Sequence, residues 1–201
     1  METNTLGKLI IALTKVPQYW ALLLDVVEKL AKPDFASELG RFARRETCWV
    51  SNMLRIKRNR FNPSRFVGEG WSILYDETDA RSIALTELDP TKIRQVTMLK
   101  HNESRITGEE RLKRLKASSF IRLDADIFLM FLKNQHLIPE SWKEKVNGNT
   151  HYISFDGTIF QDPSGKRYVL YLYWLSGRWY WNTYLLDNDF DSYNVSATLA
   201  S

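Results

Sequence analysis

The side chains that carry most enzyme chemistry are few in this 201-residue chain and are scattered along it. The single cysteine, Cys48, has no histidine close to it in the sequence, and the three histidines are His101, His136 and His151. A nucleophilic site needs a base within reach of the nucleophile, and a zinc site needs ligands at characteristic spacings. No nucleophile elbow and no phosphate-cradling glycine loop occurs. The sequence therefore predicts no catalytic residues, no metal site and no cofactor.

Carboxylates leave the question of an enzyme open. The run of residues 187–191 begins like a calcium loop, but Ser192 stands where that loop needs glycine and Thr198 where it needs glutamate. A carboxylate pair for glycoside hydrolysis is defined by distance in space, so spacing in the sequence does not exclude one. The carboxylates to consider, all close to tryptophans in the aromatic part of the chain, are Asp156, Asp162 and Asp187.

A basic segment is the best functional lead, because the net charge of +4 is not spread evenly. Within residues 41–65 only Glu46 opposes the positive charges. Arginine donates hydrogen bonds in a planar fork that suits phosphates, so we expect this segment to bind an anionic partner, most plausibly nucleic acid. The alternative is a charged face that only contacts water. The candidate nucleic-acid-binding residues are Arg41, Arg44, Arg45, Arg55, Lys57, Arg58, Arg60 and Arg65.

Aromatic side chains concentrate near the C-terminus, where residues 150–193 hold 13 of the chain's Phe, Tyr and Trp residues. Aromatic rings on an open sheet can stack on bases or sugar rings, and they are also what a small sheet buries in its core. Tyr173, Trp179 and Trp181 are the candidates for an aromatic surface. A protein–protein interaction module or inhibitor that uses this sheet is the alternative to nucleic-acid binding.

The periodicity predicts an α+β fold with two regions, a helical region over residues 1–60 and an α+β domain over 61–201, packed as one unit. Residues 34–58 form the last helix of the first region, and whether 41–58 is one helix or two is left open. Small antiparallel strands follow at 71–75, 82–86 and 95–99. Helices then begin after the capping residues Thr107 and Asp124, and Pro139 opens a short turn that carries Trp142.

An aromatic antiparallel β-meander over residues 150–193 ends the predicted domain. Asp156-Gly157 is expected to form a two-residue hairpin turn, residues 162–165 a second turn, and Ser176-Gly177 the turn between two long aromatic strands. Those two strands are apolar on both faces, which is typical of strands that are covered on both sides.

The remaining composition favours a soluble cytoplasmic protein. One cysteine permits no intrachain disulfide, and the first residues show no secretory signal. Lys15, Pro17, Gln18 and Asp25 interrupt the apolar stretch from Leu9 to Val27, so we expect two amphipathic helices there and no membrane span.

Three blocks resemble blocks in a group of short bacterial proteins that have no assigned function. They are Ile138-Pro-Glu-Ser-Trp-Lys143, Phe155-Asp-Gly-Thr158 and Arg167-Tyr-Val-Leu-Tyr-Leu-Tyr-Trp174. The resemblance covers about residues 70–201 and leaves the basic N-terminal segment outside. It implies no fold, site or ligand.

Overall fold

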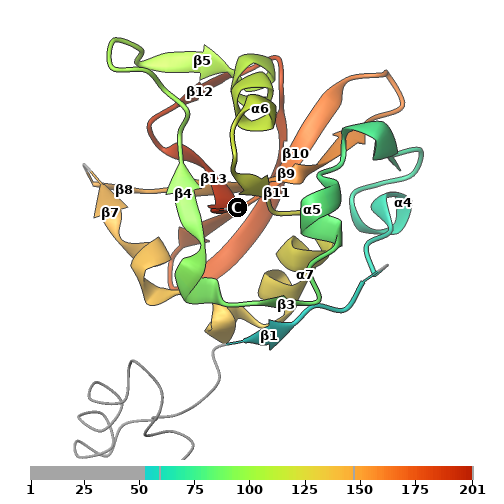
Figure 1. Ribbon diagram of the computed structural model, residues 1–201. Coiled ribbons are helices and arrows are strands. Elements are labelled where there is room, and N and C mark those ends of the chain that lie inside the picture. The colour runs from blue at the N-terminus through green and yellow to red at the C-terminus, as the bar shows by residue number, and fades with distance from the viewer. Residues whose placement is uncertain (1–52, 59, 147, 201) are drawn as a thin grey trace, which may run out of the picture. The chain divides into compact units, whose positions relative to one another are not determined.

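The computed structural model describes residues 53–58, 60–146 and 148–200. The helices expected before residue 53 lie outside the described residues, and so do Arg41, Arg44, Arg45 and Cys48. The described part is a mixed α+β structure, as the sequence predicts (Figure 1). None of the helices in these ranges is long and apolar enough to cross a membrane.

Strands and short helices alternate through the first half, and long strands dominate the second. The helices are α4 (Pro63–Phe66), α5 (Ala80–Ile83), α6 (Gly108–Ala117) and α7 (Ala125–Lys133), with 3-10 turns η2 (Tyr75–Glu77), η3 (Pro90–Lys92), η4 (Gln135–Leu137) and η5 (Glu140–Lys143). The strands are β1 (Leu54–Arg55), β2 (Ser72–Ile73), β3 (Glu87–Leu88), β4 (Arg94–Val96), β5 (Arg105–Thr107), β6 (Ile121–Arg122), β7 (Lys145–Val146), β8 (Asn149–Thr150), β9 (Tyr152–Gln161), β10 (Arg167–Leu175), β11 (Arg178–Leu185), β12 (Asp189–Asp191) and β13 (Asn194–Leu199).

The main sheet has the strand order β11-β10-β9-β13-β4, and β2 and β6 add to it beside β9 and β13. β9, β10 and β11 are consecutive and antiparallel, which confirms the predicted aromatic meander. β13 was not predicted, and it lies parallel to β9 in the middle of the sheet. The C-terminal strand therefore completes the sheet that the meander begins.

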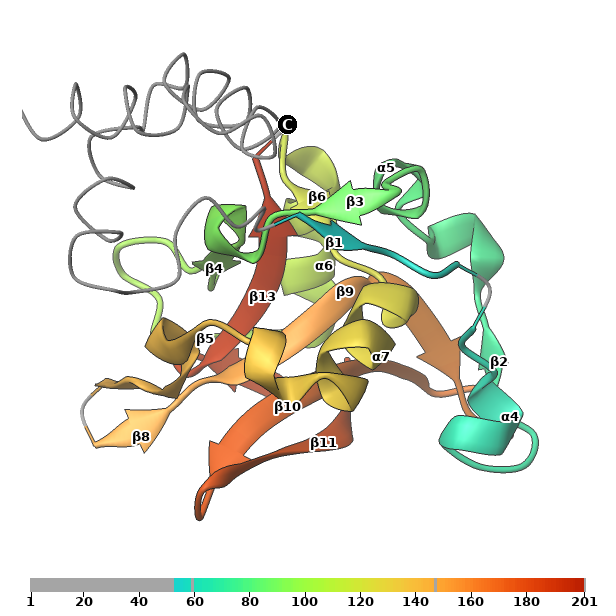
Figure 2. The ribbon, with the colours of Figure 1, turned by 90° about the horizontal axis from the view of Figure 1, so that it is seen from below.

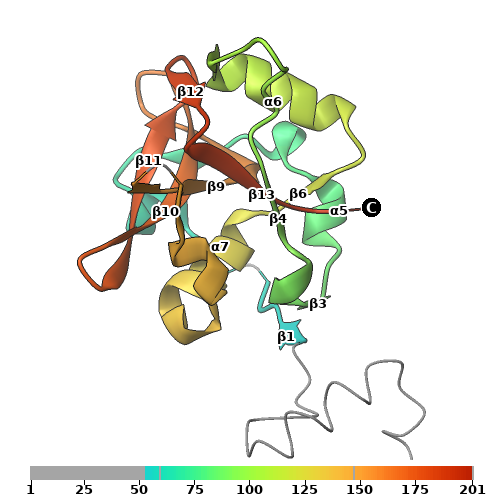
Figure 3. The same cartoon turned by 90° about the vertical axis from the view of Figure 1, so that its left-hand side faces the viewer.

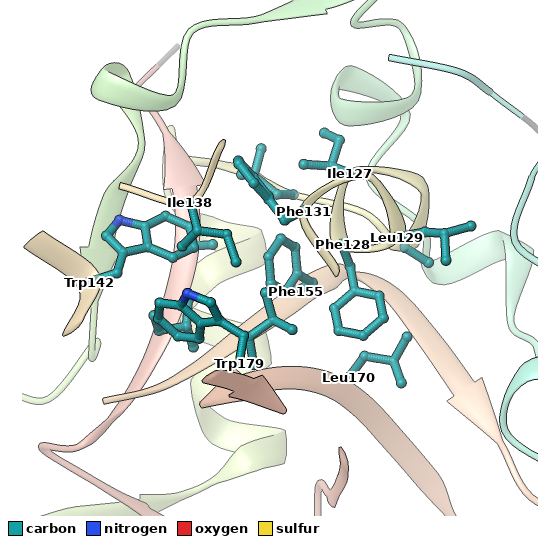
Figure 4. Close-up of a cluster of buried hydrophobic side chains, with 14 of the residues drawn as sticks. Ile127, Phe128, Leu129, Phe131, Ile138, Trp142, Phe155, Leu170 and Trp179 are labelled. Atoms are coloured by element: carbon teal, nitrogen blue, oxygen red, sulfur yellow. The ribbon is translucent and has the colours of Figure 1, made fainter. Parts of the chain in front are cut away.

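The sheet is covered differently on its two faces. Helix α7 lies on one face of the sheet (Figure 2). Leu170 and Leu172 of β10 belong to the core cluster on that face, and Leu170 lies near Phe128, Phe131 and the buried Trp179 (Figure 4). Side chains alternate along a strand, so Val169 points to the opposite face. There it packs in a second cluster with Leu112, Ile159, Leu186 and Phe190. Leu112 belongs to helix α6, which is labelled in Figure 3. Helix α7 thus covers one face of β10 and β11, whereas α6 covers only the end of the opposite face near Val169, so the predicted cover on both faces is only partly present.

Local signals place the two longer helices where the sequence predicts them. The Thr107 side chain accepts a hydrogen bond from the Glu110 amide at the start of α6. Asp124 accepts from the amides of Asp126 and Ile127 at the start of α7. Each bond satisfies an amide that has no partner within the helix. The short turn predicted after Pro139 is also present, as η5, and its Trp142 is buried.

Two of the three predicted turns are confirmed. The Asp162 carboxylate accepts hydrogen bonds from the Ser164 and Lys166 amides, and Gly165 adopts a positive φ of 86°. Ser176 and Gly177 have φ values of 49° and 86°, and they join the paired residues Leu175 and Arg178. Positive φ at both central residues is the requirement of a type I′ hairpin turn.

The third predicted turn, Asp156-Gly157, is wrong, because β9 continues through both residues. Its register against β10 shifts across residues 156–159, where β9 bulges. An added Cβ at Gly157 would lie 2.3 Å from the Arg122 carbonyl oxygen. Glycine is therefore needed here for close backbone approach between β9 and the segment after β6.

Two further expectations are corrected. The strand predicted over residues 82–86 is wrong at its start, because residues 80–83 form helix α5, whose first turn the Asp79 carboxylate caps by accepting from the Arg81 amide. The predicted helix does not extend to Arg58, because Leu54 and Arg55 pair as strand β1 with β3. Local apolar residues fit either conformation, and the cap and the strand partner decide between them.

Candidate functional site

A groove of about 540 Å³ lies between the segment after β1 and helix α7. Four exposed basic side chains surround it, and a half-apolar floor comes from α7. We call it the basic groove, and its lining residues are Arg55, Lys57, Arg60, Asp126, Leu129, Met130, Lys133 and Asn134.

The extended conformation of residues 54–57 turns two of these cations outward. Ile56 is buried in the core cluster, and its amide donates to the Thr86 carbonyl at 2.9 Å. Because successive side chains of an extended chain point to opposite sides, Arg55 and Lys57 both point away from the core. Both are exposed, as this alternation requires. The helical face that the sequence predicted for these residues is thus replaced by the outer side of strand β1 and of the segment that follows it.

Asp126 fixes the third cation. Its Oδ1 accepts the backbone amides of Arg60 at 2.9 Å and of Phe61 at 3.0 Å. Phe61 packs against Phe128 and Phe160, which anchors the segment from the other side. The main chain of Arg60 is therefore held at the start of α7 while its side chain stays exposed.

Lys133 completes the groove from the last turn of α7, and sequence analysis did not select it. Residues 126, 129, 130 and 133 are spaced by three or four positions, so they form one strip along the helix. That strip faces the groove. The available signal was a lysine at the end of a mostly apolar helix, but nothing local connects it with a segment more than 70 residues earlier.

The charge of the groove is strongly positive. Among the described residues that line it, four are cations and Asp126 is the one carboxylate. The ion pair from Arg55 to Glu87 is 3.8 Å long, and the two side chains are 91% and 45% exposed, so water and salt screen it heavily. A concave surface with charges of one sign concentrates the field inside it. The groove is therefore suited to an anionic ligand.

Arg58 and Arg65 do not line the groove. The Arg58 side chain turns inward, bonding the Asp124 carboxylate at 2.7 Å and the Leu85 carbonyl at 2.7 and 3.0 Å. It ties the segment after β1 to α7. Arg65 is exposed on α4 and stands outside the groove lining. Of the five predicted binding residues that the structure describes, it brings together Arg55, Lys57 and Arg60.

The three aromatic candidates do not form one surface. Trp179 is only 3% exposed and packs in the core under α7, so its predicted surface role is wrong (Figure 4). Trp181 is half-buried against Phe66 at 4.4 Å between ring centroids. Tyr173 pairs with Tyr180 on the opposite face of the hairpin, because odd and even positions of β11 point to opposite sides.

Two of the three carboxylates considered for glycoside hydrolysis, Asp156 and Asp162, have structural partners, and Asp187 is exposed just after the end of β11. Asp156 is completely buried and bonds Arg111 at 2.7 Å, and burial lowers the pKa of the Arg111 guanidinium while Asp156 opposes that shift. Asp162 holds the turn before β10. Among residues 53–200, apart from residues 59 and 147, no three His, Asp or Glu side chains gather as metal ligands would.

No protein-family model, curated protein or solved structure matches the chain. The geometry of the described residues is thus the basis for assigning a function.

Proposed function

We propose that the protein binds nucleic acid through the basic groove, by contacts to backbone phosphates. The observation that supports this most directly is the convergence of Lys133 with Arg55, Lys57 and Arg60 from a distant part of the chain. Lys133 lies beside the basic segment only because the chain folds, so the local composition of that segment does not account for its presence there.

The arrangement fits a phosphate backbone better than a single small anion. The cations lie on two elements, the segment after β1 and the end of α7, with the apolar stems of Leu129 and Met130 in the floor between them. Their exposed side chains keep the reach needed to follow a chain of phosphates. Contacts of this kind fix affinity and orientation and carry no base sequence.

A variant with Lys57, Arg60 and Lys133 all changed to glutamine tests the proposal. We expect binding of labelled single- and double-stranded DNA and RNA, measured by fluorescence anisotropy, to weaken by roughly tenfold or more at low salt. The slope of log affinity against log salt should also fall by about one per removed phosphate contact, hence by about three.

The matched control is Lys100, Lys113 and Lys166 changed to glutamine, which removes the same charge from exposed positions outside the groove. This variant should bind nearly as well as the unmodified chain. Equal losses in the two variants would show that net charge, and not the groove, drives binding. Absence of binding by the unmodified protein at low salt would overturn the proposal outright.

A further inference from the structure

A row of tyrosines covers the part of the sheet that α6 leaves open. Tyr171 and Tyr173 of β10 lie beside Tyr152 of β9 and beside Tyr180 and Tyr184 of β11 on one face of the meander. Leu112 of α6 covers only the end of this face next to Val169. A core face would bury such rings, but Tyr152 is 41% exposed and the other four are only partly buried.

The five tyrosine rings include one nearly parallel pair and pairs that meet edge-on. Tyr173 and Tyr180 are nearly parallel, at 22° with 5.6 Å between centroids. Tyr152 and Tyr184 stand at 78° and 74° to Tyr171. Tyr152 belongs to β9 and Tyr184 to β11, so β10 lies between them. The tyrosines thus present both ring faces and ring edges to a ligand.

This face borders a hollow of about 610 Å³ beneath the β7–β8 hairpin. We call it the tyrosine hollow. Its aromatic lining residues are Tyr152, Tyr173, Trp174, Tyr184 and Tyr193. Its polar lining residues are Lys145, Asn149, Thr150, Ser176, Asp191 and Asn194.

Contacts with β12 hold Tyr184 of the lining in place. The Tyr184 hydroxyl donates to the Asp189 carbonyl at 3.2 Å, and its ring meets Phe190 edge-on at 4.5 Å. Phe190 in turn lies under the buried Arg111 guanidinium at 3.9 Å. A ring fixed before binding loses little conformational freedom when a ligand arrives, which favours affinity.

The charges of the tyrosine hollow distinguish it from the basic groove. Of the lining residues in the part of the chain that the structure describes, Lys145 and Asp191 are the only ionic ones, and they offset each other. A nucleic-acid strand needs a continuous positive path, which is missing here. An acyl chain would leave the amides and hydroxyls of the lining without water or partners, which is costly. The remaining match is a neutral ligand with both apolar and hydroxyl surfaces.

We propose that the tyrosine hollow binds a neutral carbohydrate chain. A sugar ring has an apolar C–H face, which can lie on a tyrosine ring, and a rim of hydroxyls. Tyrosine supplies an apolar face and a hydroxyl in one rigid side chain. Asn149, Thr150 and Asn194 add amide and hydroxyl groups beside the rings. This ligand site is separate from the basic groove and does not depend on the function proposed for it.

The test is equilibrium binding of labelled neutral hexasaccharides of glucose, N-acetylglucosamine, xylose and mannose to the full chain. At least one of them should bind with a dissociation constant below about 1 mM, which is the weak end of specific binding. Tyr152→Ala, at the most exposed of the five rings, should weaken that binding at least roughly tenfold, the scale expected for loss of a buried aromatic contact. Asn149→Ala, at the exposed position of β8, is a second variant that leaves the rings intact and should also weaken the binding.

Tyr75→Ala is the matched control, because Tyr75 is 77% exposed and lies outside the tyrosine hollow. It should leave sugar binding unchanged, and so should the glutamine variant of the basic groove. Failure of all four hexasaccharides to bind at about 10 mM overturns the proposal. Sugar binding that neither Tyr152→Ala nor Asn149→Ala weakens also overturns the proposal. The same holds if no sugar binds and a nucleic acid or a protein binds instead in a way that requires Tyr152.

Discussion

Lys57 and Arg58 are neighbours in the chain, but they serve different parts of the molecule. Lys57 is exposed at the basic groove, whereas the Arg58 side chain is 19% exposed and bonds Asp124 and Leu85. Asp124 Oδ2 also accepts from the Ser82 hydroxyl at 2.5 Å, and Oδ1 caps α7. The Arg58 guanidinium thus compensates a buried carboxylate that the helix needs.

Arg58→Ala should therefore destabilise the fold by about 2–3 kcal/mol, because it leaves the buried Asp124 carboxylate without its cation. Urea denaturation of the full chain measures this. Lys57→Ala is the control and should change the free energy of unfolding by less than about 0.5 kcal/mol. If the two variants unfold at the same urea concentration, the Arg58 contacts contribute nothing to stability.

At the scale of elements, β9 is the strand on which the most connections depend. Besides its sheet partners β10, β13 and β2, its bulge bonds two other segments. The Gly157 amide donates to the Leu123 carbonyl at 2.8 Å, and the Gly157 carbonyl accepts from the Asp79 amide at 3.0 Å. Backbone contact this close on both sides leaves no room for a side chain.

Gly157→Ala should destabilise the protein by about 2–3 kcal/mol, since the new methyl group would overlap backbone atoms of Arg122 and Leu123 and force them apart. Gly68→Ala is a suitable comparison, because an added Cβ there approaches only the Trp71 ring, at 3.4 Å. The midpoints of thermal unfolding of the two variants measure the difference, and Gly157→Ala should have the lower midpoint. Equal midpoints would mean that β9 moves to accept the methyl group at no cost.

For the whole molecule, several carboxylates are held in ionised form by arginines and lysines. Hydrogen bonds from Arg114 and from the Lys100 amide lower the pKa of Glu103 to about 2. Burial acts to raise the pKa of Asp79, but bonds from Arg81 and the Arg122 amide outweigh it and leave that pKa below its ordinary value. The same balance holds for Glu77, whose pKa is lowered by Lys116 and Arg167 against the effect of burial.

Stability should consequently fall as the solution becomes acidic. A folded-state pKa below the unfolded value means that the unfolded chain binds more protons, so acid favours unfolding. For Glu103 the loss should begin near its ordinary pKa of 4.5 and finish near 2. Calorimetric midpoints between pH 7 and pH 2 should show this decline.

Glu103→Gln should make that decline less steep, because the side chain no longer titrates, while it lowers the midpoint at pH 7 by removing the ion pair with Arg114. Glu69→Gln, at an exposed loop position, provides the control. An unchanged pH profile in Glu103→Gln would exclude this carboxylate as a source of acid sensitivity.

The sequence by itself determined the features that depend on neighbouring residues. Thr107 and Asp124 cap their helices, and the Ser176-Gly177 turn sets the register of the two aromatic strands, because each requires only atoms a few residues apart. The alternation within those strands also follows from the pleat. These signals were sufficient for the α+β class and for the meander.

Only the tertiary structure decided which face of each element is covered and which distant residues meet. In the sequence Gly157 looks like a hairpin glycine, but in the fold it allows the backbone of Arg122 and Leu123 to lie against β9. In the sequence Trp179 looks like a surface aromatic residue, but in the fold it packs in the core with α7. Lys133 joins Lys57 across a groove that exists only in the folded chain. The physical reason is that burial and charge density depend on distance in space, which local sequence patterns do not encode.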